Sequence, residues 1–475
     1  MRLGALLDND ATGDVTGFAI DHRKVAPGNV FGAFKGQRFN GEDYIRQAIA
    51  AGAIAVAACP GVAVEGAVPL ISDEPRREFA LLAARYFAPF PATSVAVTGT
   101  NGKTSTVELT RQLWRMSGHH AASIGTLGVT TAHEAQTTGL TTPDIVTFLS
   151  NMAGLAREGV THAAFEASSH GLDQYRTEGL PVAAAAFTNL SRDHLDYHGD
   201  MAAYLTAKLR LFAEVVDADG TAVVWQDDES SDRVIDLARE RGLRLIGVGT
   251  RGATIKLEGR NATQLGQTLS VCHEGDRFDV KLPLIGGYQA ANALIAAGLV
   301  IATGGDPAQT FAHLARLQPV KGRLERAVIT ATGAPVYVDY AHTAAALAAA
   351  AEALRPHATG RMILVFGAGG DRDTGKRAEM GKVASEVAEI VIVTDDNPRG
   401  EDASAIRREI LAELPDAHDI GDRHAAIARA VGLAQAGDVV LIAGKGHETG
   451  QIVGSGTERR VLPFDDVEVA RMCAS

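Results

Sequence analysis

Short runs of apolar residues recur along the chain, and stretches with helical periodicity separate them. In the middle of the chain, the apolar run 95–98 is followed by predicted strands at residues 163–166, 184–188 and 221–225. Helical patterns lie between them, the first over residues 104–117, and produce a βαβ alternation. This alternation predicts a mainly parallel sheet, whose ligands bind beyond the carboxyl ends of the strands.

The last third of the chain shows the same kind of pattern. Residues 335–339, 362–367, 390–394 and 439–443 are predicted buried strands, each followed by a glycine- or aspartate-rich loop and a helical pattern. They indicate a second, Rossmann-like doubly wound sheet. Between the two parallel sheets, residues 255–283 alternate as in a small antiparallel patch.

The N-terminal part predicts a smaller unit. A strand at 30–34, a helix at 43–51 and a strand at 53–58 indicate a small α/β domain. A length of 475 residues fits roughly three domains. We therefore expect a three-domain α/β protein divided into residues 1–88, 89–317 and 318–475, in which the middle domain is similar to a P-loop ATPase.

Composition narrows the possible functions. The net charge of −12 argues against a nucleic-acid-binding surface, because few cations remain to neutralise phosphates. Cys59, Cys272 and Cys473 lie far apart, without metal-ligand spacing. The apolar runs are too short to span a membrane, and the N-terminus lacks a signal peptide pattern. We expect a cytoplasmic protein without membrane insertion, active as a monomer.

The apolar run 95–98 leads into a glycine-bounded loop and then into the start of a helix. This stretch consists of Gly99, Thr100, Asn101, Gly102, Lys103, Thr104 and Ser105. Glycines let the backbone N–H groups approach an anion, and a lysine can reach the outer phosphates of a nucleotide. The glycines lie closer together than in the common P-loop, so an ordinary strand-to-helix turn is the alternative. We expect a nucleoside triphosphate here, with the Thr104 hydroxyl on a phosphate-bound Mg²⁺.

Polar residues follow the next two predicted strands. Glu166 ends one of them, where a carboxylate could bind Mg²⁺ or serve only as a helix cap or surface acid. Segment 188–198 contains two acids and two histidines, a spacing that matches no zinc template. A polar cluster at the end of a buried strand still favours a site. Lys208 lies in a helical pattern that does not distinguish it from a surface lysine.

Three loops in the last third of the chain carry basic residues and glycines. They cover residues 367–377, 395–400 and 444–450, and each follows a predicted strand. Any one of them could be a simple turn. Together, at one edge of a sheet, they predict a site for a carboxylate- or phosphate-bearing substrate.

These motifs together resemble those of the Mur ligases, the ATP-dependent amide-forming enzymes of peptidoglycan precursor synthesis. The resemblance extends over nearly the whole chain and includes the short phosphate loop. Its motifs are Thr98-Gly-Thr-Asn-Gly-Lys-Thr104, Glu166-Ala-Ser-Ser-His170, Thr188-Asn-Leu-Ser-Arg-Asp-His194, Gly322-Arg323 and Asp339-Tyr-Ala-His342, in the order of the family.

The resemblance assigns roles around the nucleotide. The catalytic residues would be Lys103, Glu166, His194, Lys208 and Arg323. Further ATP contacts would come from Asn292, Asp339 and His342. Thr104, Glu166, His194 and Lys208 would bind Mg²⁺, with Lys208 carbamylated to a carboxylate that helps to bind a second ion.

The resemblance also assigns the two other substrates. UDP-MurNAc-L-Ala-D-Glu would contact Ile20, His22, Gln37, Arg38, Phe39, Thr141, Thr142, Ser168, Gln174 and Arg176. His22 stands where the family usually has a serine, whose hydroxyl contacts the nucleotide. The histidine puts that contact in doubt. The amino acid would contact Arg372, Asp396, Asn397, Pro398, Arg399, Gly444 and Glu448, with Glu448 facing a substrate ammonium.

The motif Asp396-Asn-Pro-Arg399 resembles that of family members that add meso-diaminopimelate as the third peptide residue. Diaminopimelate carries an ammonium and a carboxylate at its far end, where lysine has only an ammonium. Arg399 could pair bidentately with that carboxylate and would repel a lysine ammonium. Losing such a pair would cost about 2–5 kcal/mol.

The implied reaction activates the D-glutamyl carboxylate with ATP as an acyl phosphate, which the amine of diaminopimelate then attacks. Two other functions remain open. A folylpolyglutamate synthetase-like ligase shares the phosphate loop, but it would not explain the first domain or Asp396-Asn-Pro-Arg399. A nucleotide-binding regulator without ligase activity would bind ATP but would release no substrate-dependent phosphate.

Overall fold

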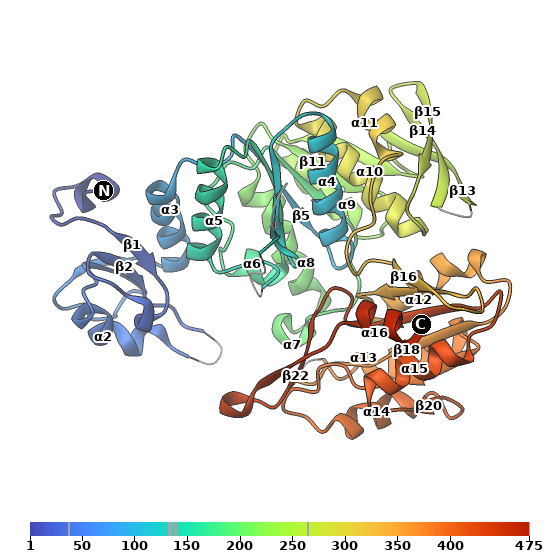
Figure 1. Ribbon diagram of the computed structural model, residues 1–475. Helices are drawn as coiled ribbons and strands as arrows, with labels where there is room; N and C mark the ends of the chain where they lie inside the picture. Colours follow the sequence, from blue (N-terminus) through green and yellow to red (C-terminus); the bar gives the residue numbers. More distant parts are fainter. Residues whose placement is uncertain (37–38, 132–134, 137–139, 264–265, 372, 475) are drawn as a thin grey trace.

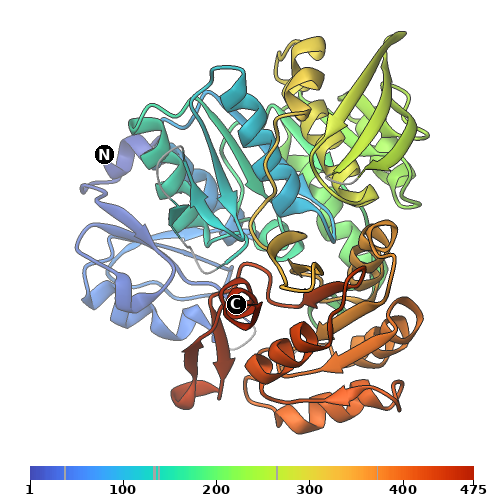
Figure 2. The same ribbon diagram turned by 45° about the vertical axis from the view of Figure 1, so that its right-hand side comes forward.

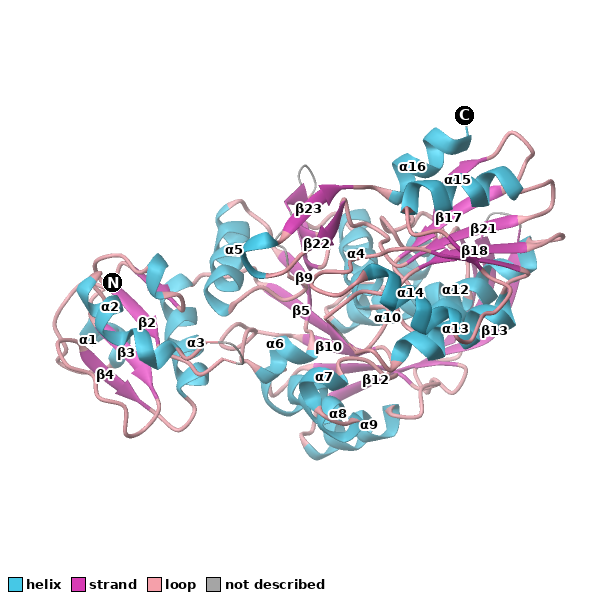
Figure 3. Ribbon diagram, turned by 90° about the horizontal axis from the view of Figure 1, so that it is seen from below, coloured by secondary structure: helices cyan, strands magenta, loops and turns pink. Residues whose placement is uncertain are grey.

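The chain forms three α/β regions that follow one another in sequence (Figure 1). This computed structural model describes residues 1–474 except 37–38, 132–134, 137–139, 264–265 and 372. Figure 3 shows the first region at one end of the molecule, the third at the other, and the middle region between them. In the described part of the chain, no helix has both the length and the apolar character needed to cross a membrane.

The first region is built on a four-stranded parallel sheet in the order β1-β2-β3-β4. Its elements are α1 (Leu3–Leu7), β1 (Gly17–Ala19), β2 (Asn29–Gly32), α2 (Ile45–Ala50), β3 (Ala55–Ala58), β4 (Val68–Ile71) and α3 (Pro75–Phe87). Strands β2 and β3 and the helix between them were predicted, whereas β1 and β4 were not. Helix α3 covers the sheet through Phe79, whose ring centroid lies 5.2 Å from that of Phe18.

The middle region contains an eleven-stranded sheet in the order β15-β14-β13-β12-β11-β10-β5-β9-β6-β7-β8. The strands are β5 (Thr93–Thr98), β6 (Ala121–Gly125), β7 (Gly128–Thr130), β8 (Ala135–Gln136), β9 (His162–Glu166), β10 (Ala184–Phe187), β11 (Thr221–Trp225), β12 (Arg244–Gly249), β13 (Ile255–Thr263), β14 (Gly266–His273) and β15 (Asp276–Leu282). The strands of the sheet's centre are parallel, and β13, β14 and β15 form the predicted antiparallel patch.

Helices cover both faces of this sheet. They are α4 (Lys103–Met116), α5 (Ile145–Arg157), α6 (Ser169–Asp173), α7 (Leu195–His198), α8 (Met201–Arg210), α9 (Ser231–Glu240), α10 (Gly287–Ala302) and α11 (Pro307–Leu314). Alternate residues of β5 point to opposite faces: Val95 and Val97 pack in the core with α4 and α10, and Ala96 packs in the core with α5.

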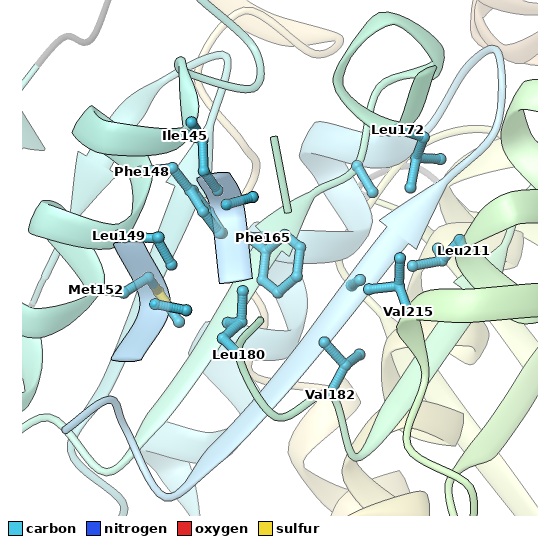
Figure 4. Packing of buried hydrophobic residues seen from close by; sticks show 14 of the residues in the cluster. Ile145, Phe148, Leu149, Met152, Phe165, Leu172, Leu180, Val182, Leu211 and Val215 are labelled. Atoms are coloured by element: carbon cyan, nitrogen blue, oxygen red, sulfur yellow. The ribbon is translucent and has the colours of Figure 1, made fainter. Parts of the chain in front are cut away.

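The core beneath α5 is shown in Figure 4. Ile145, Phe148, Leu149 and Met152 project from α5 toward Phe165 of β9. The rings of Phe148 and Phe165 lie 5.1 Å apart in an edge-to-face arrangement. This packing fixes β9, and with it the position of Glu166 at the end of the strand.

The third region is a six-stranded sheet in the order β16-β17-β21-β18-β19-β20. Its strands are β16 (Glu325–Ile329), β17 (Pro335–Asp339), β18 (Met362–Phe366), β19 (Ile390–Val393), β20 (His418–Asp419) and β21 (Val439–Ala443). Its helices are α12 (Ala344–Leu354), α13 (Lys376–Val387), α14 (Ala403–Leu411), α15 (Arg423–Leu433) and α16 (Asp466–Ala474). All strands except β16 run parallel to their neighbours, as predicted for a doubly wound sheet.

A hairpin of β22 (Gly450–Val453) and β23 (Arg460–Pro463) extends from the third region (Figure 2). The N–H of Arg399 donates to the Ile452 carbonyl at 3.1 Å, which joins this hairpin to the loop after β19. The sequence pattern did not predict the hairpin.

Candidate active site

The phosphate loop connects β5 to α4 and is shaped by two glycines. Gly99 has a φ of 147° and Gly102 a φ of 87°, both in the region that favours glycine. A Cβ on Gly99 would lie 1.9 Å from the Thr188 hydroxyl, and one on Gly102 would lie 2.4 Å from Asn292 Oδ1. No larger residue fits either position without displacing these neighbours.

The segment that follows β10 braces this loop. Asn189 accepts the N–H of Thr100 on its carbonyl oxygen and the N–H of Asn101 on its side-chain oxygen, both at 2.9 Å. The Thr188 hydroxyl donates to the Asn101 carbonyl at 2.6 Å. Strand β10 pairs with β5, so the loop rests on its neighbour strand before any ligand binds.

Two lysines converge on one carbonyl oxygen of the loop. Lys103 Nζ donates to the carbonyls of Gly99 and Thr100 at 2.9 and 2.8 Å. Lys208 Nζ, from α8, donates to the same Gly99 carbonyl at 2.7 Å and lies 4.2 Å from the centre of the Tyr204 ring. Burial lowers the pKa of both lysines, and for Lys208 the charge of Lys103 adds to the effect and the pKa is well below 10.5.

Glu166 ends β9, which pairs with β5 on the other side of the phosphate loop. The N–H of Thr126 donates to its Oε1 at 2.7 Å, and the Thr126 hydroxyl donates to its Oε2 at 3.2 Å. A Cβ on Gly125 would lie 2.2 Å from Oε1, so this glycine makes room for the carboxylate. Glu166 is therefore a fixed acidic group, only 2% exposed, beside the loop.

Asp193 and His194 come after β10 and face the third region. His194 has a φ of 56°, and burial lowers its pKa to about 3. Asp193 Oδ2 lies 3.5 Å from His194 Nε2 and 3.8 Å from Nε2 of His342, which belongs to the third region. Burial alone would raise the pKa of Asp193, but the His342 hydrogen bond and the two histidines hold it well below its usual range.

The third region completes the site with Arg323 and Asp339. Arg323 Nη2 donates to the Thr104 hydroxyl at 3.1 Å, and its guanidinium lies 4.3 Å from the centre of the Tyr340 ring. Within the described residues, the buried Nη1 of Arg323 has no hydrogen-bond partner. Asp339 accepts the N–H groups of Leu324 and Ala341 at 2.7 and 2.8 Å, and burial raises its pKa.

These groups enclose a cavity of about 410 Å³ between the middle and third regions. Its lining includes the predicted residues Thr100, Asn101, Gly102, Lys103, Thr104, Ser105, Thr141, Glu166, His194, Asn292, Arg323, Asp339 and His342. Gly99 and Lys208 are not part of the lining, and Lys208 contacts the loop at the Gly99 carbonyl. The lining combines the cations Lys103 and Arg323 with the Glu166 and Asp339 carboxylates.

The three basic loops of the third region meet at the carboxyl ends of β18, β19 and β21, as predicted. The N–H of Gly370 donates to the Asn397 carbonyl at 2.9 Å, which connects the first two loops. Asn397 Nδ2 donates to Glu448 Oε2 at 2.9 Å, which connects the second and third. Arg399 Nη1 donates to the Gly370 carbonyl at 2.8 Å.

The other residues of this predicted amino-acid site lie in the same loops. Gly444 has a φ of 115°, and a Cβ there would lie 2.6 Å from Asp396 Oδ2. Pro398 and Asp396 flank Asn397 in the loop after β19. Arg372 lies outside the described residues, as do Gln37 and Arg38 of the predicted UDP site.

The predicted UDP-substrate residues fall into two groups. Thr141, Thr142, Ser168, Gln174 and Arg176 lie near Glu166 in the middle region. The Thr142 hydroxyl donates to the Glu166 carbonyl at 2.8 Å, and Arg176 donates to the Gln174 side chain and the Thr142 carbonyl. Ile20, His22 and Phe39 belong to the first region and do not line the cavity. Phe39 is 74% exposed, and the His22 ring stacks on Tyr44 at 4.2 Å.

Asp193 and Tyr340 belong to the site, although the sequence did not predict them as site residues. Asp193 lies in the polar segment 188–198, and Tyr340 lies between the predicted residues Asp339 and His342. Their positions within these motifs could have identified them as site residues from the sequence. The contact of Asp193 with His342 depends on the packing of the third region against the middle one, whereas Tyr340 and Arg323 meet within the third region.

Family models match three successive parts of the chain. Residues 14–87 match the model described as Mur ligase family, catalytic domain, and residues 97–300 match the Mur ligase middle domain. Residues 322–446 match the model described as Mur ligase, glutamate ligase domain.

Two similar proteins carry the name UDP-N-acetylmuramoyl-L-alanyl-D-glutamate--2,6-diaminopimelate ligase. The protein from Zymomonas mobilis is 60% identical over 457 residues, which cover 96% of this chain and 94% of that protein. The protein from Bradyrhizobium diazoefficiens is 52% identical over 490 residues, which cover 100% of this chain and 99% of that protein.

Solved structures show the same arrangement of elements. A structure of a ligase with the same name has a TM-score of 0.72 and 31% identity, covering 100% of this chain and 98% of the other. A Mycobacterium tuberculosis folylpolyglutamate synthase complexed with ADP has a TM-score of 0.66 and 20% identity, covering 78% of this chain and 91% of the other. At this identity the second likeness concerns the fold alone.

Proposed function

The chain belongs to the Mur ligase family, and from this we propose that it joins 2,6-diaminopimelate to UDP-N-acetylmuramoyl-L-alanyl-D-glutamate at the expense of ATP. The amide forms on the γ-carboxylate of the D-glutamyl residue, in the synthesis of peptidoglycan precursors. The proposal draws its support from the relatives' shared name and from the geometry of the cavity.

The observation that carries the chemistry is the contact of Arg323 with the phosphate loop. Its guanidinium comes from the third region and donates to Thr104 of the middle region at 3.1 Å. A phosphoryl group bound in the cavity would thus meet Lys103 from one region and Arg323 from the other. Cations on both sides of a transferring phosphoryl group stabilise the charge that develops on its oxygens.

The reaction follows from the poor reactivity of a free carboxylate. An oxygen of the D-glutamyl γ-carboxylate attacks the γ-phosphorus of ATP, the bond to the β–γ bridging oxygen breaks, and ADP and an acyl phosphate result. The uncharged amine of diaminopimelate then attacks the acyl carbon. The amide bond forms, phosphate departs with the former carboxylate oxygen, and the nitrogen loses its proton.

The cavity is suited to Mg²⁺ held mainly by nucleotide phosphates. The described residues contain no cluster of three or more His, Cys, Asp or Glu side chains able to bind a metal by themselves. Mg²⁺ in such enzymes is usually held by one or two carboxylates, substrate phosphates and water. Glu166, Thr104 and His194 would be the protein ligands, and the ion would offset negative charge on the phosphates.

We further infer that Lys208 acts after carbamylation. Burial and the neighbouring Lys103 lower the pKa of the Lys208 amine, which favours its uncharged form, and only an uncharged amine attacks CO₂. The product is a carboxylate behind the phosphate loop, next to Lys103. It would place a negative charge beside Lys103 and add an oxygen ligand for a second Mg²⁺.

Recognition of the amino acid is assigned to the loops of the third region. Arg399 would pair with the distal carboxylate of meso-diaminopimelate, and Glu448 would face its ammonium. The remaining contacts would come from Arg372, Asp396, Asn397, Pro398 and Gly444. Lysine lacks the distal carboxylate, so Arg399 would both attract the correct substrate and repel the wrong one.

The UDP end of the other substrate is assigned to the first region, within the proposed domain of residues 1–88. Ile20, His22 and Phe39 are exposed or half-buried there. Its peptide would extend to Thr141, Thr142, Ser168, Gln174 and Arg176 beside Glu166. One chain supplies all three substrate sites, so a monomer would be sufficient for catalysis.

A folylpolyglutamate synthase is the main rival, because it shares the fold over 78% of this chain. It offers no role for the Asp396-Asn-Pro-Arg399 loop. A nucleotide-binding regulator is the second rival, but it offers no role for the loops of the third region.

Phosphate release with ATP and UDP-MurNAc-L-Ala-D-Glu tests the proposal. We expect release with meso-diaminopimelate and much less with L-lysine. Equal rates with both amino acids would contradict the role of Arg399. Activity with neither would contradict the proposed function.

A further inference from the structure

Lys445 is a fully buried lysine that the reaction described above does not use. It follows Gly444 in the loop after β21, and its side chain is 0% exposed. A lysine is almost never fully buried unless its ammonium is paired. The groups around the Lys445 ammonium should therefore indicate the role of its charge.

The ammonium of Lys445 has four oxygen atoms around it. It donates to Asn397 Oδ1 at 3.0 Å and to the Gly450 carbonyl at 2.8 Å. Glu448 Oε2 lies at 3.4 Å and Asp396 Oδ1 at 3.5 Å. Three of these four partners belong to the predicted amino-acid site, and the fourth begins strand β22.

These contacts fix how Asn397 and Glu448 are presented. Asn397 Oδ1 accepts from Lys445 and also from the N–H of Ile452 at 2.8 Å. With its oxygen occupied, the amide directs its NH₂ group to Glu448 Oε2 at 2.9 Å. Lys445 therefore controls the orientation of one site residue directly and of a second through it.

The charges lead to the same conclusion. Asp396 and Glu448 both approach the Lys445 ammonium, so without it two acids would face each other with no cation between them. Asp396 has little room to move away, because it is only 6% exposed. Repulsion between the acids would then displace Glu448, which lies on the more exposed side of the cluster.

A nearby ion pair shows what a purely structural pair looks like. Arg423 and Asp466 are both 0% exposed and 2.7 Å apart, and Arg423 also donates to the Ala443 carbonyl. That pair connects α15 to α16, and its carboxylate partner Asp466 is not among the predicted substrate contacts. Lys445, in contrast, contacts only the loops after β19 and β21 among the hydrogen bonds and ion pairs of the described residues.

We propose that Lys445 is a positioning residue of the amino-acid site, which holds Asn397 and Glu448 in the geometry that receives the ammonium of the incoming amino acid. It does not touch the reacting atoms and acts through its neighbours. This inference rests on the proposed function of the third-region loops.

Steady-state kinetics of the full-length Lys445→Met variant test the proposal. We expect KM for meso-diaminopimelate to rise about tenfold or more, the scale observed when groups that orient a ligand's partners are removed. KM for ATP and for UDP-MurNAc-L-Ala-D-Glu should stay within about twofold of wild type, because the cavity at the phosphate loop is intact. Lys382→Met, which removes an exposed lysine of α13, is the matched control and should change none of the three constants.

Lys445→Arg provides a second test that keeps the positive charge. Its planar guanidinium cannot reproduce the four contacts of an ammonium, so KM for diaminopimelate should rise less than in Lys445→Met but remain above wild type. An unchanged KM for diaminopimelate in Lys445→Met, or an equal rise in all three KM values, would overturn the proposal. Failure of both variants to fold would also overturn it, because Lys445 would then serve the fold. If wild type shows no diaminopimelate-dependent phosphate release, the proposed function itself fails.

Discussion

Lys208 and Lys445 are both fully buried, yet they lie in opposite electrostatic surroundings. Lys208 Nζ donates to one carbonyl oxygen, lies over the Tyr204 ring and has Lys103 as a charged neighbour. Lys445 Nζ lies among two carboxylates, an amide oxygen and a carbonyl oxygen. The same residue type at the same burial therefore favours an uncharged amine at the phosphate loop and an ammonium at the amino-acid loops.

The comparison separates two kinds of function. A buried amine without an acidic partner is expensive to charge, which makes it reactive. A buried ammonium surrounded by acids is stable in its charged form and orients them. We accordingly assign chemistry to the region around the phosphate loop and selection of the amino acid to the loops of the third region.

The largest expected effect is that of Arg323→Ala on turnover. Loss of the guanidinium should lower kcat about 10³-fold or more, the scale of an arginine that stabilises a transferring phosphoryl group. The fold should remain, as judged by circular dichroism. Arg316→Ala, which removes an exposed arginine shortly before this segment, is the control. Near-normal turnover of Arg323→Ala would show that Arg323 of the third region takes no part in the chemical step.

Arg399→Ala should affect the selection of the amino acid at the loops of the third region. We expect a lower kcat/KM for meso-diaminopimelate. The fall should correspond to a loss of about 2–5 kcal/mol of transition-state stabilisation, because the distal carboxylate loses its bidentate partner. KM for ATP should not change. The exposed Arg408 of α14 provides the control variant Arg408→Ala. Equal losses with diaminopimelate and L-lysine would show that Arg399 does not discriminate between them.

The two lysines should respond to methionine substitution with opposite signs. Lys445→Met removes one partner of a buried ionic cluster and should lower the free energy of unfolding by about 3 kcal/mol. Lys208→Met removes an amine that is costly to bury and should raise it by about 1 kcal/mol. Urea unfolding in metal-free, bicarbonate-free buffer measures both. Destabilisation of both variants by the same amount would contradict the proposed difference between the surroundings of Lys208 and Lys445.

The stabilising effect of Lys208→Met should also depend on pH. The pKa of Lys208 in the folded protein lies well below its ordinary value of 10.5, so below that pH the unfolded chain binds more protons than the folded one. Stability of the wild type therefore rises as the pH approaches 10.5, and the variant lacks this contribution. The free energy of unfolding of Lys208→Met should therefore exceed that of wild type by more at about pH 7 than at about pH 9.5.

A carbamate on Lys208 predicts a dependence of activity on CO₂. If Lys208 acts as a carbamate, wild-type activity should fall about 10- to 100-fold after chelation and removal of CO₂, and bicarbonate should restore it. Lys208→Met should show no response, whereas Lys445→Arg should retain it. An equal bicarbonate response of wild type and Lys208→Met would contradict the carbamate.

The sequence predicted the elements that carry the site because their signals are local. Strand β5 and helix α4 enclose a glycine-bounded loop, and their bounds agree with the predicted run 95–98 and helix 104–117 to within a few residues. Glu166 and the segment after β10 were placed at strand ends for the same reason. Strands β1 and β4 were missed because their sequences lack a clear alternation of apolar and polar residues.

The sequence by itself determined the phosphate loop, the alternation of strands and helices, and the family, since each depends on residues adjacent in the chain. Only the tertiary structure decided that Arg323 reaches Thr104 and that His342 pairs with Asp193. It also decided that, within the described residues, Lys208 is buried without an ion pair while Lys445 is buried among acids. These properties depend on which distant segments pack together. Charge and reactivity of a lysine follow from the dielectric and the charges around its nitrogen, which residue spacing along the chain does not specify.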